Sequence, residues 1–516
     1  MKKIILLSLI FLCLIAGSCK KALEINSTRV VSEENFWNTL EDSRAALVGV
    51  YGLTRAALAD NNGHWIYGDV RLGNFDSPIR QDLKAIVKND LNASYPVVEA
   101  LSNWRRFYAI VNSANIFLER IHEVKEKDAR YTANNMIVDV AQVRFLRAFA
   151  YFYMARIWGD VPFITTSRDG AFEDKPKTDQ NTILEFVQQE MLTAAADLPY
   201  LYAANDIQQP GLYYNEGRSR WDGALVRKLS AYAVLAHVAA WRGKYADVTI
   251  YTKMVLDNYP KASMNYTNTN DLTRRQGIFY DKKNNQLLGF GFIFAHQDAT
   301  FTGNLESLTL AEPIVNKSLP DIFVPKDSIL SIFKEANDAR FNIDTTGFVH
   351  SQLYFTNFQG KYPIFSKIKV MQGGSSDPTF RIYSSAILFT RLEDVTLLRA
   401  EALAVLGERD GAITALNTVR QLRYNVDNVG KVNENSGTYV PYSEARSGTL
   451  IDAIFKERQK ELMGEGQRWY DLVRYHKIVQ NNAAFTQLIS TGGIFWPVSR
   501  NILAQNPLLT QNSYWK

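Results

Sequence analysis

Cysteine is almost absent from this chain of 516 residues, which contains only Cys13 and Cys19. Both lie within the first nineteen residues, so the rest of the chain can form no disulfide and no cysteine-ligated metal site. Enzyme motifs are missing too: there is no His-Glu-x-x-His, no Gly-x-Ser-x-Gly and no phosphate-binding glycine loop. The six histidines show no metal-ligand spacing. The sequence therefore indicates no cofactor, no metal and no catalytic residue.

A strong charge of one sign is also lacking. Lys and Arg number 58 against 53 Asp and Glu, a net charge of +5 that is too small and too dispersed for a nucleic-acid binder. Hydrophobic residues make up 46% and charged residues 22%, as in an ordinary globular protein. Aromatic residues are plentiful at 12%, and they fill cores as well as binding surfaces.

Long apolar runs are absent except at the start of the chain. Lys2 and Lys3 precede a predominantly apolar run from Ile4 to Ile15, and the small residues Ala16–Ser18 follow. This order predicts a secretory signal at residues 1–18, because the run is shorter than the roughly 20 residues that span a bilayer. With Cys19 next, the segment resembles a bacterial lipobox, although Ala16 stands where leucine is commonest. Cys19 is then the acylated residue; ordinary cleavage that leaves a free thiol is the alternative.

Helical periodicity dominates the remainder of the chain. Helices are expected at 36–58, 103–123, 136–158, 181–198, 224–257, 391–424 and 447–480. Glycines and prolines predict irregular structure over 61–102, and residues 258–385 are expected to form long loops with a few short strands. The tail at 494–516 is expected to be extended.

Two of the expected helical hairpins share a turn pattern. Gly407 with Ala412 matches the turn and second helix of a tetratricopeptide unit, and Gly243 with Tyr245 marks a similar turn. The two turns are far apart in the sequence, which favours degenerate helical pairs within a larger fold over a tandem array. The predicted fold class is therefore mostly α, with tetratricopeptide-like helical pairs supporting a loop-rich lobe.

Four segments in chain order resemble the SusD/RagB family. They are Ala141–Phe152 with Trp158–Pro162, Arg391–Ala402 with Ala415–Arg420, Glu457–Arg474, and Phe495–Val498 with Asn506–Asn512. The resemblance covers nearly the whole mature chain. It implies one compact SusD-like fold with an N-terminal region at 19–230 and a C-terminal region at 231–516.

The resemblance also implies a function. Members of this family are lipoproteins on the outer face of the Bacteroidetes outer membrane, where they serve as lids on SusC-like TonB-dependent transporters. They capture oligosaccharides or, in some members, peptides or other nutrients. The implied partners are the transporter, an oligosaccharide or peptide, and a membrane reached through a lipid anchor, with no nucleic acid.

Charged residues recur within the apolar helices of these motifs. They are Arg144, Arg147, Glu401, Arg458, Glu461, Glu465, Arg468 and Asp471. Glu461 and Glu465 could serve as a general acid and base, but neighbouring arginines favour ion pairs that lock helices together. The expectation is a structural role.

The ligand site is predicted from chemistry, because aromatic rings cover the apolar faces of sugars while polar neighbours bind the hydroxyl groups. Trp65 and Tyr67 are predicted to form a platform in an extended loop, unless Trp65 is a core anchor. The polar neighbours of this platform are His64, Asp69, Arg71, Asn74 and Asp76. A second candidate comprises Tyr280, Phe292, Phe294 and His296, and a third comprises Tyr213, Tyr214, Arg220 and Trp221. For both of these sets, packing in the core is the favoured alternative.

Three functions remain open at this point. The first is nutrient capture without catalysis. The second is a surface glycoside hydrolase, since two carboxylates that meet only on folding leave no local motif. The third is a helical-repeat scaffold that binds only protein.

Overall fold

Helices make up most of the structure, a computed structural model that describes residues 36–168, 173–292, 303–335, 337–372, 382–424 and 441–516. The longer helices are α2 (Leu40–Ala59), α6 (Arg105–Lys127), α7 (Ala133–Trp158), α8 (Gln180–Asp197), α9 (Lys228–Trp241), α10 (Tyr245–Asn258), α14 (Leu392–Val405), α15 (Arg409–Arg423), α17 (Leu450–Glu461) and α18 (Arg468–Val479). The prediction of a mostly α fold is confirmed.

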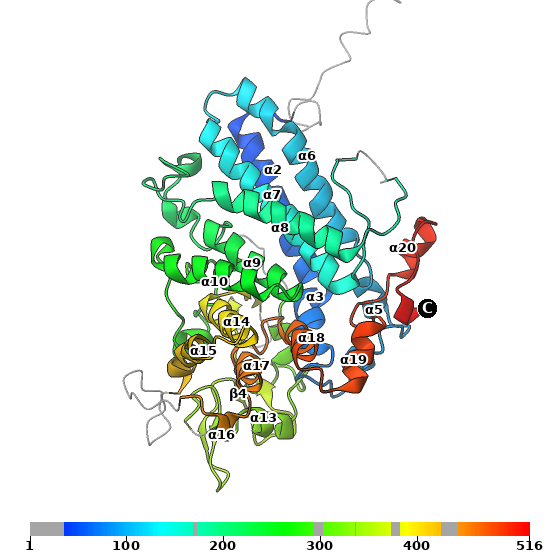
Figure 1. Cartoon of the computed structure of the whole chain (residues 1–516), viewed down its shortest axis with the longest axis vertical. Helices are drawn as coiled ribbons and strands as arrows, with labels where there is room; N and C mark the ends of the chain where they lie inside the picture. Colours follow the sequence, from blue (N-terminus) through cyan, green and yellow to red (C-terminus); the bar gives the residue numbers. More distant parts are fainter. Residues whose placement is uncertain (1–35, 169–172, 293–302, 336, 373–381, 425–440) are drawn as a thin grey trace, which may run out of the picture.

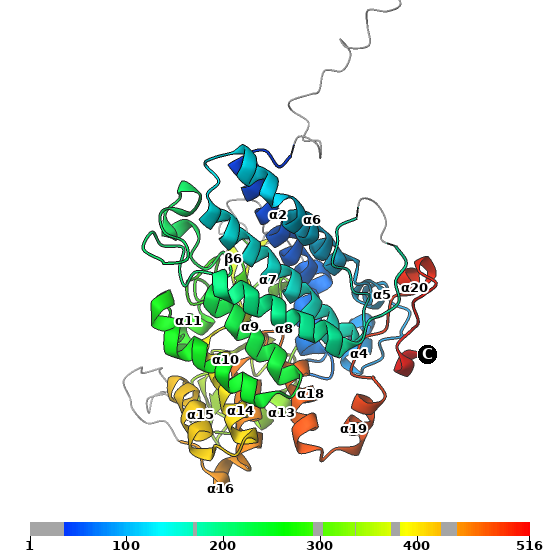
Figure 2. The same ribbon diagram turned by 45° about the horizontal axis from the view of Figure 1, so that its top comes forward.

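Successive long helices pack side by side (Figures 1 and 2). α6 lies against α2 and α7, α8 against α7 and α9, and α10 against α9 and α14. α14 in turn packs on α15 and α17. The two tetratricopeptide-like hairpins, α9–α10 and α14–α15, are therefore neighbours in space although a long loop region separates them in the sequence.

The centre of this arrangement is α7. Thr132 caps its first turn, where the Thr132 hydroxyl accepts a hydrogen bond from the amide of Asn135 at 3.1 Å. Nearly every residue from Val138 onward is buried, because apolar residues lie on every face of the helix and α2, α6, α8 and α9 pack around it. It ends at Gly159, whose φ of 75° is a conformation that glycine adopts without strain.

The predicted turns of the two hairpins are confirmed. Gly243 and Gly407 have φ values of 73° and 83° and follow the ends of α9 and α14. The helical region at 447–480 is divided between α17 and α18 by a turn in which Gly464 and Gly466 have φ values of 79° and 74°.

Two sequence predictions are wrong in detail. The 61–102 segment is not irregular throughout, because short helices form where its apolar residues meet the core. They are η2 (Asp60–Asn62), α3 (Gly63–Trp65), the π-helical η3 (Ile66–Val70), α4 (Gln81–Val87) and α5 (Pro96–Leu101). The tail is not wholly extended either, because Ser499 caps a short helix, α20 (Arg500–Gln505).

The loop-rich region carries the strands and several short elements. Four two-stranded antiparallel sheets form: β1 (Leu288–Phe290) with β8 (Ile387–Thr390), β2 (Asn342–Ile343) with β3 (Val349–Ser351), β4 (Phe355–Thr356) with β5 (Ile364–Phe365), and β6 (Met371–Gln372) with β7 (Ile382–Tyr383). The other short elements are η4 (Tyr213–Asn215), η5 (Arg218–Arg220), η6 (Tyr259–Ala262), α11 (Thr269–Thr273), α12 (Glu306–Thr309), α13 (Lys326–Ile332), α16 (Glu444–Ser447), α19 (Ala483–Ser490) and η8 (Ser513–Trp515). The expectation of loops with a few short strands is confirmed.

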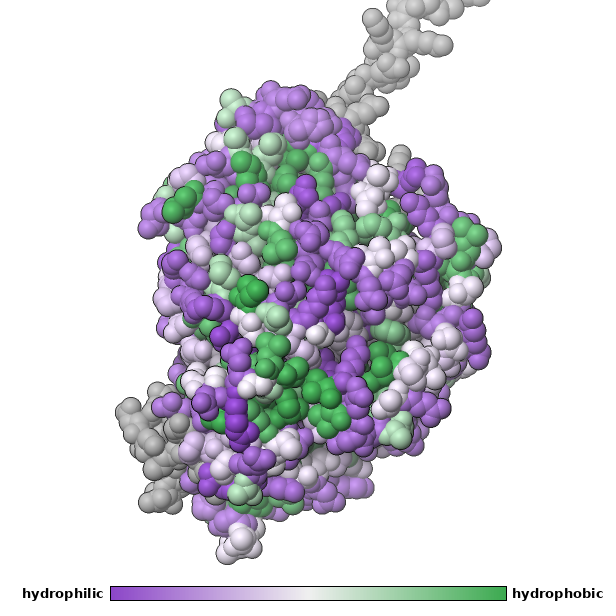
Figure 3. All heavy atoms as spheres, in the orientation of Figure 1, coloured by the Kyte–Doolittle hydropathy of each residue, from purple (hydrophilic) through white to green (hydrophobic). Residues whose placement is uncertain are grey.

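The division between 19–230 and 231–516 stays a prediction. It falls within α9, which packs on α8 from one region and on α10 from the other. The face in Figure 3 is mostly hydrophilic, with apolar side chains gathered in the lower half of the view. Within the described ranges, each helix is too short or too polar to cross a membrane.

Candidate ligand-binding site

The predicted aromatic platform lies in the core. Trp65 is 2% exposed and Tyr67 is 4% exposed. The Tyr67 ring makes edge contacts with Trp158 and Trp496 at centroid distances of 5.9 and 5.1 Å, and its hydroxyl donates to the Leu101 carbonyl at 2.7 Å. The prediction that these rings form an exposed platform is wrong, and the alternative of a core anchor describes Trp65.

Local conformation explains the error. Side chains two residues apart point the same way in a strand, but in a helix they are separated by about 200° of rotation. Residues 63–70 are helical, so Trp65 and Tyr67 face different directions, and both directions are filled by protein.

The polar neighbours of the predicted platform hold the segment to the rest of the fold. His64 contacts the Tyr153 hydroxyl at 2.8 Å, and burial lowers its pKa to about 3. Arg71 donates to the Ile494 carbonyl at 2.6 Å, and the Asn74 side chain accepts from Gln459 at 2.6 Å. The Asp69 carboxylate accepts from the amide of Gly466.

Asp76 completes this set of seven residues. It is only partly buried, and its main chain pairs with Phe323 in an isolated β-bridge. Apart from Asp76, the set is enclosed by protein and cannot reach a ligand at the surface.

A cavity of about 330 Å³ opens to the surface beside α2. Four residues on one face of α2 form its first wall, and two segments distant in sequence form the others. Its lining residues are Val48, Tyr51, Gly52, Arg55, Arg220, Trp221, Ala224, Leu225, Asp281, Lys282, Phe290 and Gly291. This volume is at the lower end of the range for small-molecule sites, and aromatic surface alternates with charged groups.

The cavity brings together parts of the second and third predicted sites. Trp221 and Arg220 of the third candidate are lining residues. Tyr280 and Phe292 of the second candidate are neighbours in sequence of Asp281 and Gly291, and the Phe292 ring lies under the Arg55 guanidinium at 4.9 Å. Phe294 and His296 lie outside the described residues.

The α2 wall of the cavity was not predicted from the sequence. Gly52 is the signal that could have revealed it, since glycine inside a helix costs about 1 kcal/mol relative to alanine. An added Cβ at Gly52 would meet no atom within 4 Å. The position is therefore open, and Gly52 leaves room in the cavity.

A hydrogen-bond chain behind the cavity holds two of its walls together. The Tyr51 hydroxyl of α2 donates to Gln142 of α7 at 2.7 Å and accepts from the Val226 amide at 2.9 Å. Gln142 donates to the Tyr213 hydroxyl at 2.8 Å, and this hydroxyl donates to the Asp139 carboxylate.

Trp221 is held from its own side of the cavity. Its indole donates to the Tyr213 carbonyl at 3.2 Å, and the rings of these two residues are in edge contact at 5.4 Å. The Arg44 guanidinium lies over the Trp221 ring at 5.3 Å. The position of Trp221 is thus fixed before a ligand arrives.

Two other observations concern binding groups. A second cavity of about 330 Å³ lies between residues 91–102 and 497–511, with Glu99 and Arg500 as its charged lining residues. In the part of the chain that the structure describes, no three His, Cys, Asp or Glu side chains gather to bind a metal ion.

The charged residues of the sequence motifs form ion pairs within the scaffold. The pairs are Arg144 and Arg147 with Glu190 (2.9 and 2.6 Å), Glu401 with Arg474 (2.8 Å), Arg458 with Asp394 and Asp471 (2.9 Å each), Glu461 with Arg391 and Arg423 (2.7 and 2.8 Å), and Glu465 with Arg391 (2.8 Å). Arg468 differs, since it has no ion-pair partner among the described residues.

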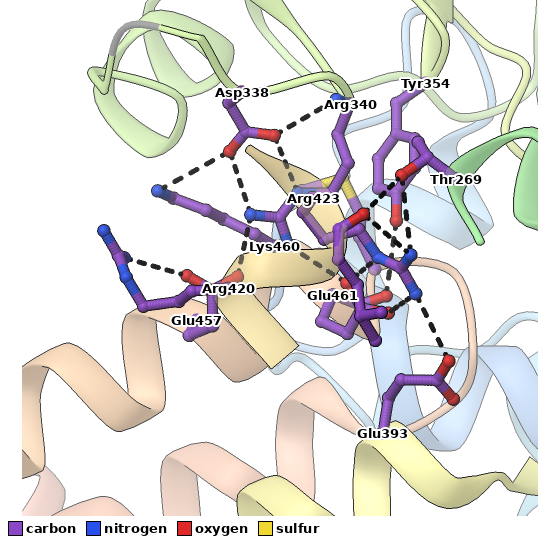
Figure 4. A network of polar contacts seen from close by, with 12 residues as sticks. Thr269, Asp338, Arg340, Tyr354, Glu393, Arg420, Arg423, Glu457, Lys460 and Glu461 are labelled. Carbon is purple, nitrogen blue, oxygen red and sulfur yellow. Dashed lines mark hydrogen bonds and ion pairs between the residues drawn. The ribbon is translucent and has the colours of Figure 1, made fainter. Parts of the chain in front are cut away.

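Glu461 is at the centre of the largest network (Figure 4). The figure shows Arg340 and Arg423 converging on this carboxylate from separate segments. Burial alone would raise the pKa of Glu461, but the charges of Arg423 and Arg391 hold it well below its usual range. Glu461 and Glu465 are enclosed and fully paired, so neither can serve a ligand as acid or base.

Comparisons with known proteins agree with the fold. A model of the SusD family matches residues 354–487, and a family model described as "Starch-binding associating with outer membrane" matches residues 74–202. The chain is 46% identical to a SusD superfamily protein from Bacteroides thetaiotaomicron VPI-5482 of known crystal structure, with a TM-score of 0.82 over 93% of this chain and 99% of that one. It is also 26% identical to SusD-like protein P38 of Formosa agariphila, over 99% of each chain.

A crystallised SusD homolog from Bacteroides thetaiotaomicron, 22% identical with a TM-score of 0.73, shares the fold over 93% of this chain and 99% of its own. The mostly helical scaffold with a few short two-stranded sheets is a SusD-like fold. The chain belongs to the SusD/RagB family, a family of binding proteins associated with the outer membrane. The predicted resemblance is confirmed.

Proposed function

We propose that this protein captures an oligosaccharide in the cavity beside α2, on the outside of the outer membrane, and delivers it to a SusC-like TonB-dependent transporter. The observation that carries the proposal is the cavity itself. It is preformed and open to the surface. Tyr51, Trp221 and Phe290 line it beside Asp281 and Lys282, although Trp221 and Phe290 are only 7% and 5% exposed. Sugar rings need this combination of flat apolar surface and hydrogen-bonding groups.

Capture without catalysis is favoured over hydrolysis. Glycoside hydrolysis uses two carboxylates about 5–10 Å apart on either side of the scissile bond. Asp281 is the single carboxylate among the described lining residues. The carboxylates of the family motifs lie in the core and are already paired.

Attachment to the membrane is part of the same proposal. The signal at 1–18 and the acylated Cys19 lie outside the described residues, so they are inferred from the sequence alone. More than one acyl chain is needed for firm anchoring, at about 0.8 kcal/mol per buried CH₂ group. Replacing Cys19 with alanine should move the protein to a soluble fraction, whereas Cys13→Ala should have no effect on the mature protein. A Cys19→Ala variant that remains membrane-bound would contradict the lipid anchor.

Binding in the cavity can be tested with two glycines of α2. Gly52→Leu fills the cavity, while Gly49→Leu adds the same side chain three residues earlier, at a position that does not line it. Both changes add helix propensity, so both variants should melt at or above the temperature of the parent. An oligosaccharide array followed by calorimetric titration of a bound saccharide should show at least a tenfold loss of affinity for Gly52→Leu only. Equal affinities for the two variants would place the ligand elsewhere.

A further inference from the structure

The cavity wall carries an excess of positive charge at one side of its opening. Arg220 and Lys282 come from different segments, and both line the cavity. The Lys282 ammonium donates to the carbonyl oxygens of Ser219 and Arg220 at 3.1 and 2.8 Å, so its side chain is tied to the main chain of the Arg220 segment. The Lys282 ammonium is thereby held beside the main chain of Arg220.

Neither charge is neutralised by an ion pair with a described residue. The two acceptors of Lys282 are neutral carbonyl groups, which leave one of its three N–H donors for another partner. The Arg220 side chain is exposed. The nearest carboxylate in the sequence, that of Asp222, forms its ion pair with Arg218 at 2.9 Å. Burial lowers the pKa of Lys282 and the Arg220 charge lowers it further, while the charges of Asp281 and Asp222 raise it.

Asp281 is the single carboxylate among the described lining residues. One of its oxygens is buried in the wall, closed to the cavity and without a hydrogen-bond partner among the described residues. Three cationic lining residues, Arg55, Arg220 and Lys282, outnumber this carboxylate, so the cavity favours a negative group over a positive one.

We infer that the ligand is an anionic oligosaccharide, whose carboxylate or sulfate group lies between Arg220 and Lys282. This inference rests on the proposed function and narrows its ligand class. The second cavity differs, because its charged residues, Glu99 and Arg500, are balanced in sign. A charged group between two cations of a partly enclosed site gains affinity that salt weakens.

The test compares three saccharide classes of equal length: galacturonate oligosaccharides, sulfated galactan oligosaccharides and neutral galactan oligosaccharides. Titration calorimetry at low and high salt should show at least one anionic class binding about tenfold tighter than the neutral class, with an advantage that shrinks in high salt. Which anionic class binds distinguishes carboxylate from sulfate.

Variants locate the contact. Arg220→Gln should remove most of the anionic advantage, and Arg220→Lys should restore part of it. Lys244→Gln removes one positive charge at the turn between α9 and α10, away from the cavity lining, and should change nothing. Lys282→Gln should also weaken anionic binding, with thermal unfolding measured in parallel because its ammonium bridges two carbonyl groups.

The outcomes separate the two proposals. Equal or tighter binding of the neutral class would overturn the anionic ligand and leave oligosaccharide capture intact. Failure of all three classes to bind would count against oligosaccharide capture and the anionic ligand together. Anionic binding that is unchanged in Arg220→Gln and Lys282→Gln would contradict the assigned position of the negative group.

Discussion

Asp139 of α7 and Tyr213 of η4 are joined by a buried hydrogen bond from the tyrosine hydroxyl to the carboxylate. Tyr214 and Tyr131 donate to the same carboxylate at 2.6 and 2.9 Å. Because Tyr213 also accepts from Gln142, this carboxylate lies at the inner end of the chain that reaches Tyr51 in the cavity wall.

Replacing Asp139 with asparagine should change the pH dependence of stability. Burial raises the pKa of Asp139 to about 7, although the three tyrosine hydroxyls act to lower it. In the unfolded chain the pKa is about 3.9, so between about pH 4 and pH 7 the folded state holds one more proton than the unfolded state. The free energy of unfolding contributed by this group is therefore greatest below about pH 4 and falls as the pH rises to 7.

Urea unfolding of the parent and of Asp139→Asn across this pH range measures the effect. The stability of the parent relative to the variant should fall by on the order of 4 kcal/mol between pH 4 and pH 7. Other buried carboxyl groups contribute equally to both proteins and cancel in the difference. A difference that does not change with pH would mean that Asp139 titrates normally.

The Glu465 carboxylate should matter for folding. It accepts from Arg391 at 2.8 and 2.9 Å and also from Lys367, all within the core. Glu465→Gln keeps the shape but leaves the two cations without their full counter-charge, which should cost about 3–5 kcal/mol of unfolding free energy. Ligand affinity of the folded variant should stay near that of the parent.

Glu444 provides the matched control for this substitution. Its pair with Arg409, at 3.1 Å, joins side chains that are 64% and 53% exposed. Glu444→Gln should therefore cost no more than about 1 kcal/mol. Equal stability of the two variants would contradict the role given to the buried network, and loss of a hydrolytic activity in Glu465→Gln with stability intact would revive the enzyme hypothesis.

Trp65→Ala should now affect stability more than binding. Replacing a buried tryptophan with alanine lowers the free energy of unfolding by about 3–5 kcal/mol. The control is Phe348→Ala, at an exposed position on the β2–β3 hairpin, which should lower it by less than about 0.5 kcal/mol. Chemical unfolding gives both values, and titration of the folded fraction gives affinity. A Trp65→Ala variant with parental stability and weakened binding would restore the predicted platform.

The sequence was informative where a pattern is local and uninformative where folding joins distant segments. The periodicity of 136–158 identified α7, and Gly243 and Gly407 identified the turns of the α9–α10 and α14–α15 hairpins. Helix period and helix ends depend on nearby residues, so a local pattern is enough to predict them. The cavity combines α2 with residues 220–225 and 281–291, and no local pattern connects these segments. At 61–70 the spacing of Trp65 and Tyr67 was consistent with an extended loop, but the segment is helical and both side chains are buried.

Gly68 of η3 lies in close contact with Gly466, which belongs to the turn before α18. A Cβ added to Gly68 would lie 1.9 Å from the Gly466 carbonyl oxygen, and a Cβ added to Gly466 would lie 2.5 Å from the His64 ring. The clash at Gly68 is with the main chain of Gly466, so rotating a side chain cannot relieve it.

Gly68→Ala should therefore lower the free energy of unfolding by about 3 kcal/mol or more, since an overpacked site must move main chain. Gly49→Ala is the matched control: it lies within α2, an added Cβ meets nothing within 4 Å, and it should raise stability by about 0.5–1 kcal/mol. Urea unfolding of both variants decides the matter. If Gly68→Ala unfolds at the same urea concentration as Gly49→Ala, the two chain segments are not in contact, and residues 61–76 would again be available as a ligand-binding loop.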